Sequence, residues 1–259
     1  MKGIIRSQLY ETKVTLSMWI VALIAFVMTF MDWKCAVEEY TGTGLYTGVE
    51  ALSETCNHTM AIYFLCFTIA HFVCRNWKNK TLYQDVLAGY SRKQVFFGRV
   101  IPAFVIGVTG ALVLTYGDVV FHTIVHGWGS DVSVGAVFMD LINYVLLLFR
   151  LMAEVVLLSV VLKRTSVVFI LCLIVDYMEF SIIIMGGKPL QFPWVCGMFF
   201  SKSVTIPETS EVFNEAGEIV QAYSFGTMGE YMILMGSSLI IGGICLFAAY
   251  RIFKKKQMY

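Results

Sequence analysis

Residues 134–185 decide the fold of this chain. They read VGAVFMDLINYVLLLFRLMAEVVLLSVVL at 134–162 and VVFILCLIVDYMEFSIIIM at 167–185, joined by Lys163-Arg164-Thr165-Ser166. Each apolar stretch is long enough to cross a membrane as a helix, which takes roughly 20 residues. Neither stretch alternates apolar and polar residues as a transmembrane strand does. The sequence therefore predicts two consecutive membrane helices joined by a tight turn.

The composition of the whole chain agrees with a membrane protein. Of its 259 residues, 58% are hydrophobic and 14% are charged, and the mean hydropathy is +0.74. Soluble domains average about 45–50% apolar and about 25% charged residues, and disordered chains have the opposite balance. The formal net charge of +1 argues against a nucleic-acid partner, since such proteins carry a basic patch.

Four further stretches are similarly apolar, and all six predict membrane-spanning helices. They use about half of the chain at roughly 20 residues each. We expect an all-α integral membrane protein that forms a single transmembrane domain over residues 1–259. The spans are expected at about 15–33, 58–75, 95–116, 134–162, 167–185 and 230–250.

Charged residues between the spans alternate in sign and predict the orientation. The N-terminal stretch, the second and fourth loops and the C-terminal tail are basic, whereas the other loops are acidic. The positive-inside rule places both termini and the basic loops in the cytoplasm. Residues 2–13 combine Ile4, Ile5 and Leu9 with basic side chains, which favours an interfacial helix; a disordered basic leader is the alternative. No A-x-A-like cleavage site follows the first span, so we expect it to be retained.

Sequence signatures of an enzyme or a metal site are absent. The chain has no G-x-x-x-x-G-K-[ST] loop, no H-E-x-x-H pair and no G-x-S-x-G elbow. We therefore expect no catalytic residue, cofactor or metal in this chain. His122 and His126 lie four residues apart but lack a clear third ligand. Cys35 and Cys56 share one acidic loop, so a disulfide between them is an alternative to two separate thiols.

Charged residues inside the predicted spans mark one candidate site. Asp140, Arg150 and Glu154 lie on one stripe of the fourth span, where Arg150 and Glu154 can pair at i, i+4. Asp176 and Glu179 share a face of the fifth span. Such charges are costly in a membrane and normally face the bundle interior. Two interpretations stay open: a polar translocation wall with a gate, in which Arg150 pairs with Asp176 or Glu179, and a cluster that only fixes helix packing.

The loop at residues 80–99, KTLYQDVLAGYSRKQVFFGR, carries the most specific local signal. Leu82, Val86 and Leu87 favour one apolar face on a short helix that ends at Gly89. An apolar face held outside the membrane by basic flanks predicts docking of another protein. An ordinary interfacial loop is the alternative.

The residues after this helix carry a family resemblance. Ser91, with Gln94 three positions later, predicts a capping box at the start of the third span. The run formed by Leu87, Gly89, Ser91 and Arg92 resembles the segment before the third span in permeases of the ABC type-2 transporter family. The six-span plan and the interfacial helix also resemble that family. Among its members, small Firmicutes-type permeases look most similar, namely those that export amphipathic peptides such as phenol-soluble modulins or confer immunity to bacteriocins.

The resemblance implies an export permease of the bacterial plasma membrane without a nucleotide site of its own. Separate ATPase subunits would bind ATP and Mg²⁺ and dock on a coupling helix at residues 80–90, and a second copy or a close relative would complete the membrane half. The cargo would be an amphipathic peptide or a lipid-like molecule, and residues 186–229 would form an outer segment with re-entrant helices. The implied docking residues are Leu82, Tyr83, Asp85, Val86, Leu87, Gly89, Ser91 and Arg92.

Other functions remain alternatives. A proton-coupled secondary transporter would use Asp140, Asp176 and Glu179, although such folds usually contain internal repeats and none is visible between residues 1–130 and 131–259. An intramembrane enzyme needs a nucleophile or a metal constellation, which the sequence lacks. A bacteriocin-immunity permease would share the ABC mechanism and differ only in its role.

Overall fold

The computed structural model describes residues 2–16, 18–27, 30, 47–54, 59–78, 81–129, 134–186, 208–213, 219–224 and 228–255. Most of these residues are helical, and residues 18–27 form a helix ahead of α3. The elements in chain order are α1 (Lys2–Val14), α3 (Gly48–Glu54), α4 (Thr59–Lys78), α5 (Thr81–Leu87), α6 (Arg92–His126), α7 (Val134–Leu162), α8 (Thr165–Gly186), β1 (Glu208–Phe213), β2 (Ile219–Ser224) and α11 (Met228–Lys255).

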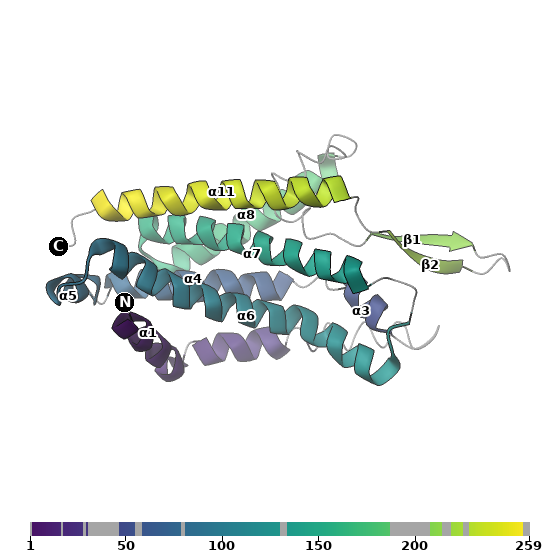
Figure 1. The fold of residues 1–259 in the computed structure, drawn as a ribbon, viewed down its shortest axis with the longest axis horizontal. Coiled ribbons are helices and arrows are strands. Elements are labelled where there is room, and N and C mark those ends of the chain that lie inside the picture. Colours follow the sequence, from purple (N-terminus) through teal and green to yellow (C-terminus); the bar gives the residue numbers. More distant parts are fainter. Residues whose placement is uncertain are drawn as a thin grey trace.

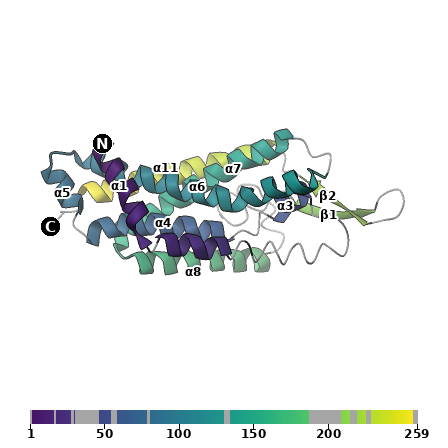
Figure 2. The same ribbon diagram turned by 90° about the horizontal axis from the view of Figure 1, so that it is seen from below.

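The long helices α4, α6, α7 and α11 run alongside one another as a bundle (Figure 1). The short helix α5, the start of α1 and the C-terminal end of α11 lie at one end of this bundle, and α3 and the β-hairpin lie at the other. Helix α1 crosses the first end at a steep angle to the long helices, whereas α8 runs along α4 (Figure 2). Elements from both halves of the chain therefore meet at the end that carries α5.

Three of the described helices are long and apolar enough to cross a membrane, namely Arg92–His126, Val137–Leu162 and Tyr231–Lys255. Shorter apolar helices cover Met18–Val27 and Thr165–Val175. These helices are compatible with the expected transmembrane protein. The presence of six spans and the cytoplasmic location of both termini remain predictions.

The tight turn predicted between the fourth and fifth spans is present between α7 and α8. Helix α7 ends at Leu162 and α8 begins at Thr165. Lys163 takes a left-handed backbone conformation with a φ of +58°, and its N–H donates to the Ser159 carbonyl at 3.0 Å. A left-handed residue after the last helical turn is a common helix ending. The next helix can therefore begin only two residues later.

Two glycines let α6 approach α4 closely. A Cβ added at Gly107 would lie 2.4 Å from Leu65 Cδ1, and one at Gly110 would lie 2.2 Å from Phe64 Cε1. Small residues at such contacts let helix backbones come together, which is a main source of packing between membrane helices. The close approach buries Leu65 completely in the apolar core of the bundle.

Helix α6 is longer than the sequence predicted, because it continues past the expected end near residue 116 to His126. Leu52 of α3 packs against Val119 in this extension. This tertiary burial stabilises a helix where the sequence predicted a loop. The helix ends before Gly127, whose φ of +84° favours glycine.

Within the outer segment 186–229, strands β1 and β2 form a β-hairpin that the sequence did not predict. Strands β1 and β2 pair antiparallel, with Glu208 opposite Ser224. Both strands contain β-branched and aromatic residues, which favour a pleated backbone. The expected re-entrant helices of this segment stay a prediction, because residues 187–207 lie outside the described part of the structure.

Candidate functional site

Helix α5 is the predicted short helix after the second span, and its ending confirms the sequence pattern. The Tyr90 N–H donates to the Asp85 carbonyl at 3.2 Å, and the Gly89 N–H donates to the Val86 carbonyl at 3.0 Å. Gly89 has a φ of +89°, so these bonds form a Schellman motif, which ends a helix with a glycine in the left-handed conformation. The motif turns the chain from α5 towards α6.

The predicted capping box at the start of α6 is also present. The Ser91 side chain accepts a hydrogen bond from the Gln94 N–H, and the Gln94 side chain accepts one from the Ser91 N–H at 2.9 Å. The two side chains satisfy amide groups that the first turn of a helix leaves without partners. Local hydrogen bonds therefore fix the connection between α5 and α6 at both of its ends.

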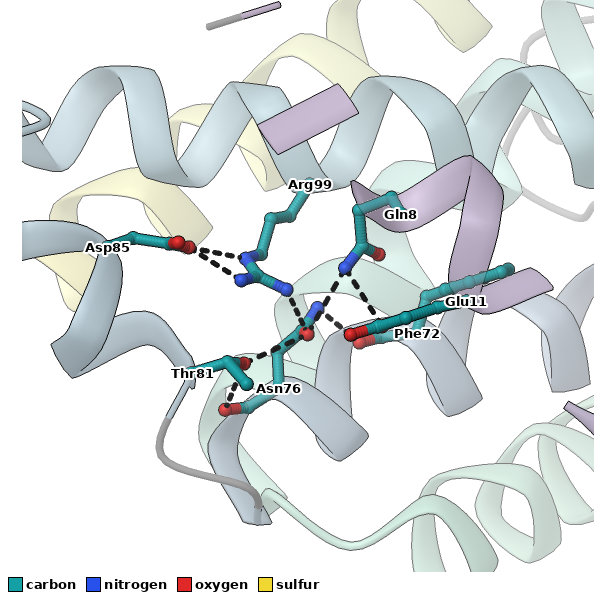
Figure 3. Close-up of polar contacts among 7 residues, drawn as sticks. All are labelled: Gln8, Glu11, Phe72, Asn76, Thr81, Asp85 and Arg99. Carbon is teal, nitrogen blue, oxygen red and sulfur yellow. Dashed lines mark hydrogen bonds and ion pairs between the residues drawn. The ribbon is translucent and has the colours of Figure 1, made fainter. Parts of the chain in front are cut away.

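A buried arginine on α6 binds the short helix directly (Figure 3). Arg99 donates from Nε and Nη2 to one carboxylate oxygen of Asp85, at 2.9 and 2.6 Å. The Arg99 side chain is 6% exposed and the Asp85 side chain is 21% exposed. Charge-assisted hydrogen bonds of this length are among the stronger contacts between side chains. An ion pair that is largely withdrawn from solvent thus holds α5 against α6.

The same arginine reaches further helices through one asparagine (Figure 3). Arg99 Nη1 donates to Oδ1 of Asn76 on α4, and Nε2 of Gln8 on α1 donates to that oxygen at 3.3 Å. Thr81 Oγ1, at the start of α5, donates to it at 3.3 Å. The Asn76 amide is itself held in place, because its Nδ2 donates to the Phe72 carbonyl at 2.6 Å. This network joins α1, α4, α5 and α6, and we call its members the polar clamp: Gln8, Asn76, Asp85 and Arg99.

Aromatic side chains extend the contact from the polar clamp to α11. Phe96 of α6 lies 5.2 Å from Phe253 of α11, measured between ring centroids. Trp77 of α4 meets Phe253 edge to face at 5.7 Å. Arg92, in the first turn of α6, donates to the Lys254 carbonyl at the end of α11, a common way to satisfy the last carbonyls of a helix. The end of the last helix is therefore packed into the same assembly as α5.

The exposed face of α5 differs from the one that the sequence predicted. Leu82 is 5% exposed and belongs to the apolar core, and Val86 is half-buried. Tyr83 and Leu87 are 45% and 68% exposed, and Gln84 beside them is exposed as well. The expectation that Leu82 faces a partner is wrong, because α5 packs back on the bundle and buries that side chain. Tyr83, Gln84 and Leu87 form the surface that α5 offers, and we call it the α5 outer face.

The remaining residues of the predicted docking set position α5. Asp85 belongs to the polar clamp, and Gly89 and Ser91 shape the turn after the helix. Arg92 connects the start of α6 to α11. These four residues hold the helix in place and do not belong to its outer face.

The polar stripe of the fourth span faces the bundle, as the sequence predicted. Asp140, Asn143 and Arg150 on α7 are 7%, 1% and 4% exposed. Tyr116 of α6 donates to Asp140 Oδ2 at 3.2 Å. Arg150 Nε donates to Glu154 Oε1 at 2.9 Å, which confirms the predicted pair along the helix. The Glu154 side chain is 33% exposed.

The gate contact proposed for Arg150 stays a prediction. Asp176 and Glu179 lie on α8, but their side chains are outside the described part of the structure. Arg150 has its ion pair with Glu154 on its own helix. Asp140 and Arg150 are thus buried in the bundle, and pairing of Arg150 with an acid of α8 stays a prediction.

Metal-ligating residue types are scattered through the described ranges. Among those residues, no group of three or more His, Cys, Asp or Glu side chains is placed to bind a metal ion. The rings of His122 and His126 stack with their centroids 5.6 Å apart. Cys35 and Cys56, between which a disulfide was left open, lie outside the described residues.

Sequence reasoning missed three members of the polar clamp. Arg99 is a charged residue in the first turns of the predicted third span. A charge in a span normally has a partner nearby, and Asp85 is the only acidic residue of the adjoining loop, so this pairing was the available signal. Gln8 and Asn76 carry no charge, and nothing in the sequence distinguishes them from polar residues at a surface.

Comparison with models of known protein families finds no match for this chain, and no curated protein matches its sequence. The function therefore has to be inferred from the fold and the site. The α5 outer face and the polar clamp behind it are the features that such an inference has to explain.

Proposed function

We propose that the chain is the membrane permease subunit of an ABC exporter, in which separate ATPase subunits supply the energy. The observation that carries this proposal is the arrangement of α5. This short helix stands at one end of the bundle and exposes Tyr83 and Leu87. Behind that outer face, the polar clamp ties α5 to α1, α4 and α6.

A docking helix has two physical requirements, and α5 meets both. Its outer face has to bury area against the partner, and Tyr83 and Leu87 are largely exposed; tyrosine is enriched among the residues that dominate binding energy. Its inner face has to be held firmly, since otherwise a push from the partner would displace α5 alone. The Asp85–Arg99 ion pair and the buried Leu82 supply that attachment.

The charge distribution supports a cytoplasmic location for the α5 end, where ATP is available. Basic residues gather at the start of α6, at the turn between α7 and α8, and at the end of α11. The α7–α8 turn belongs to this end, because Lys163 lies over the Trp77 ring at 4.4 Å. Under the positive-inside rule, this end faces the cytoplasm of a bacterial cell. The basic residues are Arg92, Lys93, Lys163, Arg164, Arg251, Lys254 and Lys255.

The remaining parts of the exporter follow from the same proposal. A second copy of the chain or a close relative completes the membrane half, and the ATPase subunits hold ATP and Mg²⁺. A push on α5 reaches α4 and α6 through the polar clamp, and α11 through Phe96 and Phe253. The helices then change between two packings of different stability. Their apolar, aromatic surfaces suit an amphipathic or lipid-like cargo, with a peptide as the expected class.

A proton-coupled transporter is the second candidate, and Asp140 is the observation that favours it. Its side chain is 7% exposed on α7 and accepts a hydrogen bond from Tyr116. Buried acids of this kind mark proton relays in transporters. We prefer the ABC exporter, because proton transfer along α7 would not involve the polar clamp or the α5 outer face.

Co-purification with an ATPase separates the two candidates. The full chain is extracted from its native membrane in mild detergent, and ATP hydrolysis is measured on the eluate. We expect an ATPase subunit to co-purify with the unchanged chain and to be lost from Tyr83→Ser/Leu87→Ser. Truncating a central interface residue costs about 2 kcal/mol or more, which is roughly 30-fold in Kd.

The matched control is Ile124→Ser/Val125→Ser, at the opposite end of α6. Both residues are exposed and apolar, at 78% and 54%, so the change removes comparable surface away from α5. This control should keep the ATPase. Two results together would favour the proton-coupled transporter instead. The unchanged chain would purify without an ATPase, and the Asp140→Asn variant would lose transport.

A further inference from the structure

We propose that Cys66 and Cys172 form a redox-active thiol pair, which a membrane-soluble hydroperoxide converts into a disulfide between α4 and α8. This inference does not depend on the proposed function, because it rests on the packing of two helices and on thiol chemistry.

Helix α4 packs along α8 (Figure 2), and the two thiols lie on these two helices. The thiols of Cys66 and Cys172 are hydrogen-bonded to each other, and both residues are thiols rather than halves of a disulfide. Next to them, the rings of Phe67 and Phe169 make an edge-to-face contact with their centroids 5.7 Å apart. This aromatic contact fixes the register of the two helices, so the sulfur atoms stay neighbours.

The two thiols differ in accessibility, and this difference sets the order in which they react. Cys66 is 1% exposed inside the apolar core, whereas Cys172 is half-buried at the edge of that core. An oxidant that dissolves among lipid tails therefore meets Cys172 first. Burial protects Cys66 from the oxidant but leaves it in contact with the sulfur of Cys172.

A third thiol shows why contact is the decisive feature. Cys245 on α11 is half-buried like Cys172, so exposure is similar at the two positions. The hydrogen bond to Cys66 distinguishes Cys172 and gives its oxidised sulfur a neighbour with which to react.

The reaction balances with one hydroperoxide and two thiols. The sulfur of Cys172 attacks the hydroperoxide, the O–O bond breaks, and Cys172 becomes a sulfenic acid while its thiol proton leaves on the alcohol. The sulfur of Cys66 then attacks the sulfenic sulfur, the S–O bond breaks, and the thiol proton of Cys66 leaves with the hydroxyl as water. The two thiols lose two electrons in total, and the hydroperoxide gains them.

The test oxidises the full chain in its native membrane with tert-butyl hydroperoxide. Remaining thiols are blocked with N-ethylmaleimide, and linked peptides are identified by mass spectrometry after proteolysis. We expect the hydroperoxide to create a linked pair that contains Cys66 and Cys172 and has two hydrogen atoms fewer than the two separate thiol peptides. Dithiothreitol should restore both thiols.

Three single variants separate this pair from general thiol oxidation. Cys66→Ser should lose the linked pair and leave Cys172 as a sulfenic or more highly oxidised acid. Cys172→Ser should lose the linked pair and leave Cys66 as an unmodified thiol, because burial shields it. Cys245→Ser is the matched control on α11 and should form the link with unchanged yield.

Several results would overturn the proposal. One is a link between Cys172 and Cys245 in place of the expected pair. Another is oxidation of Cys66 in Cys172→Ser at the rate seen in the unchanged chain. A third is an intact thiol pair after hydroperoxide doses that already oxidise methionine residues of the same chain.

Discussion

Arg99 and Arg150 are both buried arginines on long apolar helices, 5% and 4% exposed, yet their ion pairs act differently. Arg99 pairs with Asp85 on another helix and so fixes α5 against α6. Arg150 pairs with Glu154 one turn along its own helix, and this pair adds nothing to the position of α7 against a neighbour. An ion pair can transmit a push between elements only when its two partners lie on different elements.

Removal of the Asp85 carboxylate should therefore have the largest effect on stability. In Asp85→Leu, the buried Arg99 guanidinium loses its ion-pair partner, and breaking a buried pair costs roughly 3–5 kcal/mol. We expect the lower end of that range, because the Asp85 side chain is 21% exposed. Denaturant unfolding in detergent micelles measures the loss, and Asp85→Glu is the control that keeps the charge. A loss of about 1 kcal/mol or less, the value of an exposed ion pair, would contradict the role of the polar clamp.

The close contact between α6 and α4 at Gly110 should give the next largest effect. A Cβ at Gly110 meets three atoms of the Phe64 ring, the nearest at 2.2 Å, so Gly110→Ala forces this buried ring to shift against its neighbours. Overpacking of this kind costs about 1–3 kcal/mol, measured by the same unfolding experiment. Gly117→Ala is the control, because no heavy atom lies within 4 Å of its Cβ. Equal stability of the two variants would show that close approach at Gly110 is unimportant.

Loss of the capping box at Ser91 should have a smaller effect. Ser91→Ala removes the acceptor for the Gln94 N–H, and such a change costs about 1 kcal/mol. Because the box sits between α5 and α6, we also expect faster amide hydrogen exchange in the first turn of α6. Ser91→Asp keeps an acceptor and should restore protection. Unchanged exchange in Ser91→Ala would mean that tertiary contacts alone hold this turn.

Removal of the Glu154 charge should have the smallest effect. The Glu154 side chain is 33% exposed and so stays partly hydrated, which lowers the cost of removing its charge. In Glu154→Gln, an amide oxygen can still accept from Arg150. The same unfolding experiment compares this variant with Asp85→Leu. A loss as large as that of Asp85→Leu would remove the contrast between the two arginines.

Local features of the α5–α6 connection and of α7 could be predicted from the sequence, because each depends on a few neighbouring residues. Gly89 ends α5, and Ser91 with Gln94 begins α6, through hydrogen bonds that span at most five positions. The inward direction of Asp140 and Arg150 follows from helix periodicity and the cost of charge in a membrane. These features need no knowledge of the neighbouring helices.

Features that depend on tertiary packing could not be predicted in the same way. Leu82 has an apolar side chain whether it faces a partner or the core, and only the position of α5 against the bundle decides between them. Gln8 lies 68 positions from Asn76 in the chain, and no sequence pattern connects the two residues. The extension of α6 to His126 likewise depends on the burial of Val119 under α3.

Photo-crosslinking from the α5 outer face in native membranes tests the central claim most directly. A photoreactive phenylalanine analogue is placed at Leu87, which is 68% exposed, or at Ile124, which is 78% exposed at the other end of the bundle. We expect the probe at Leu87 to form an adduct with a nucleotide-binding ATPase subunit, and the probe at Ile124 to form none with that protein. The same ATPase adduct from both positions, or adducts from Leu87 with lipid alone, would contradict a docking role for α5.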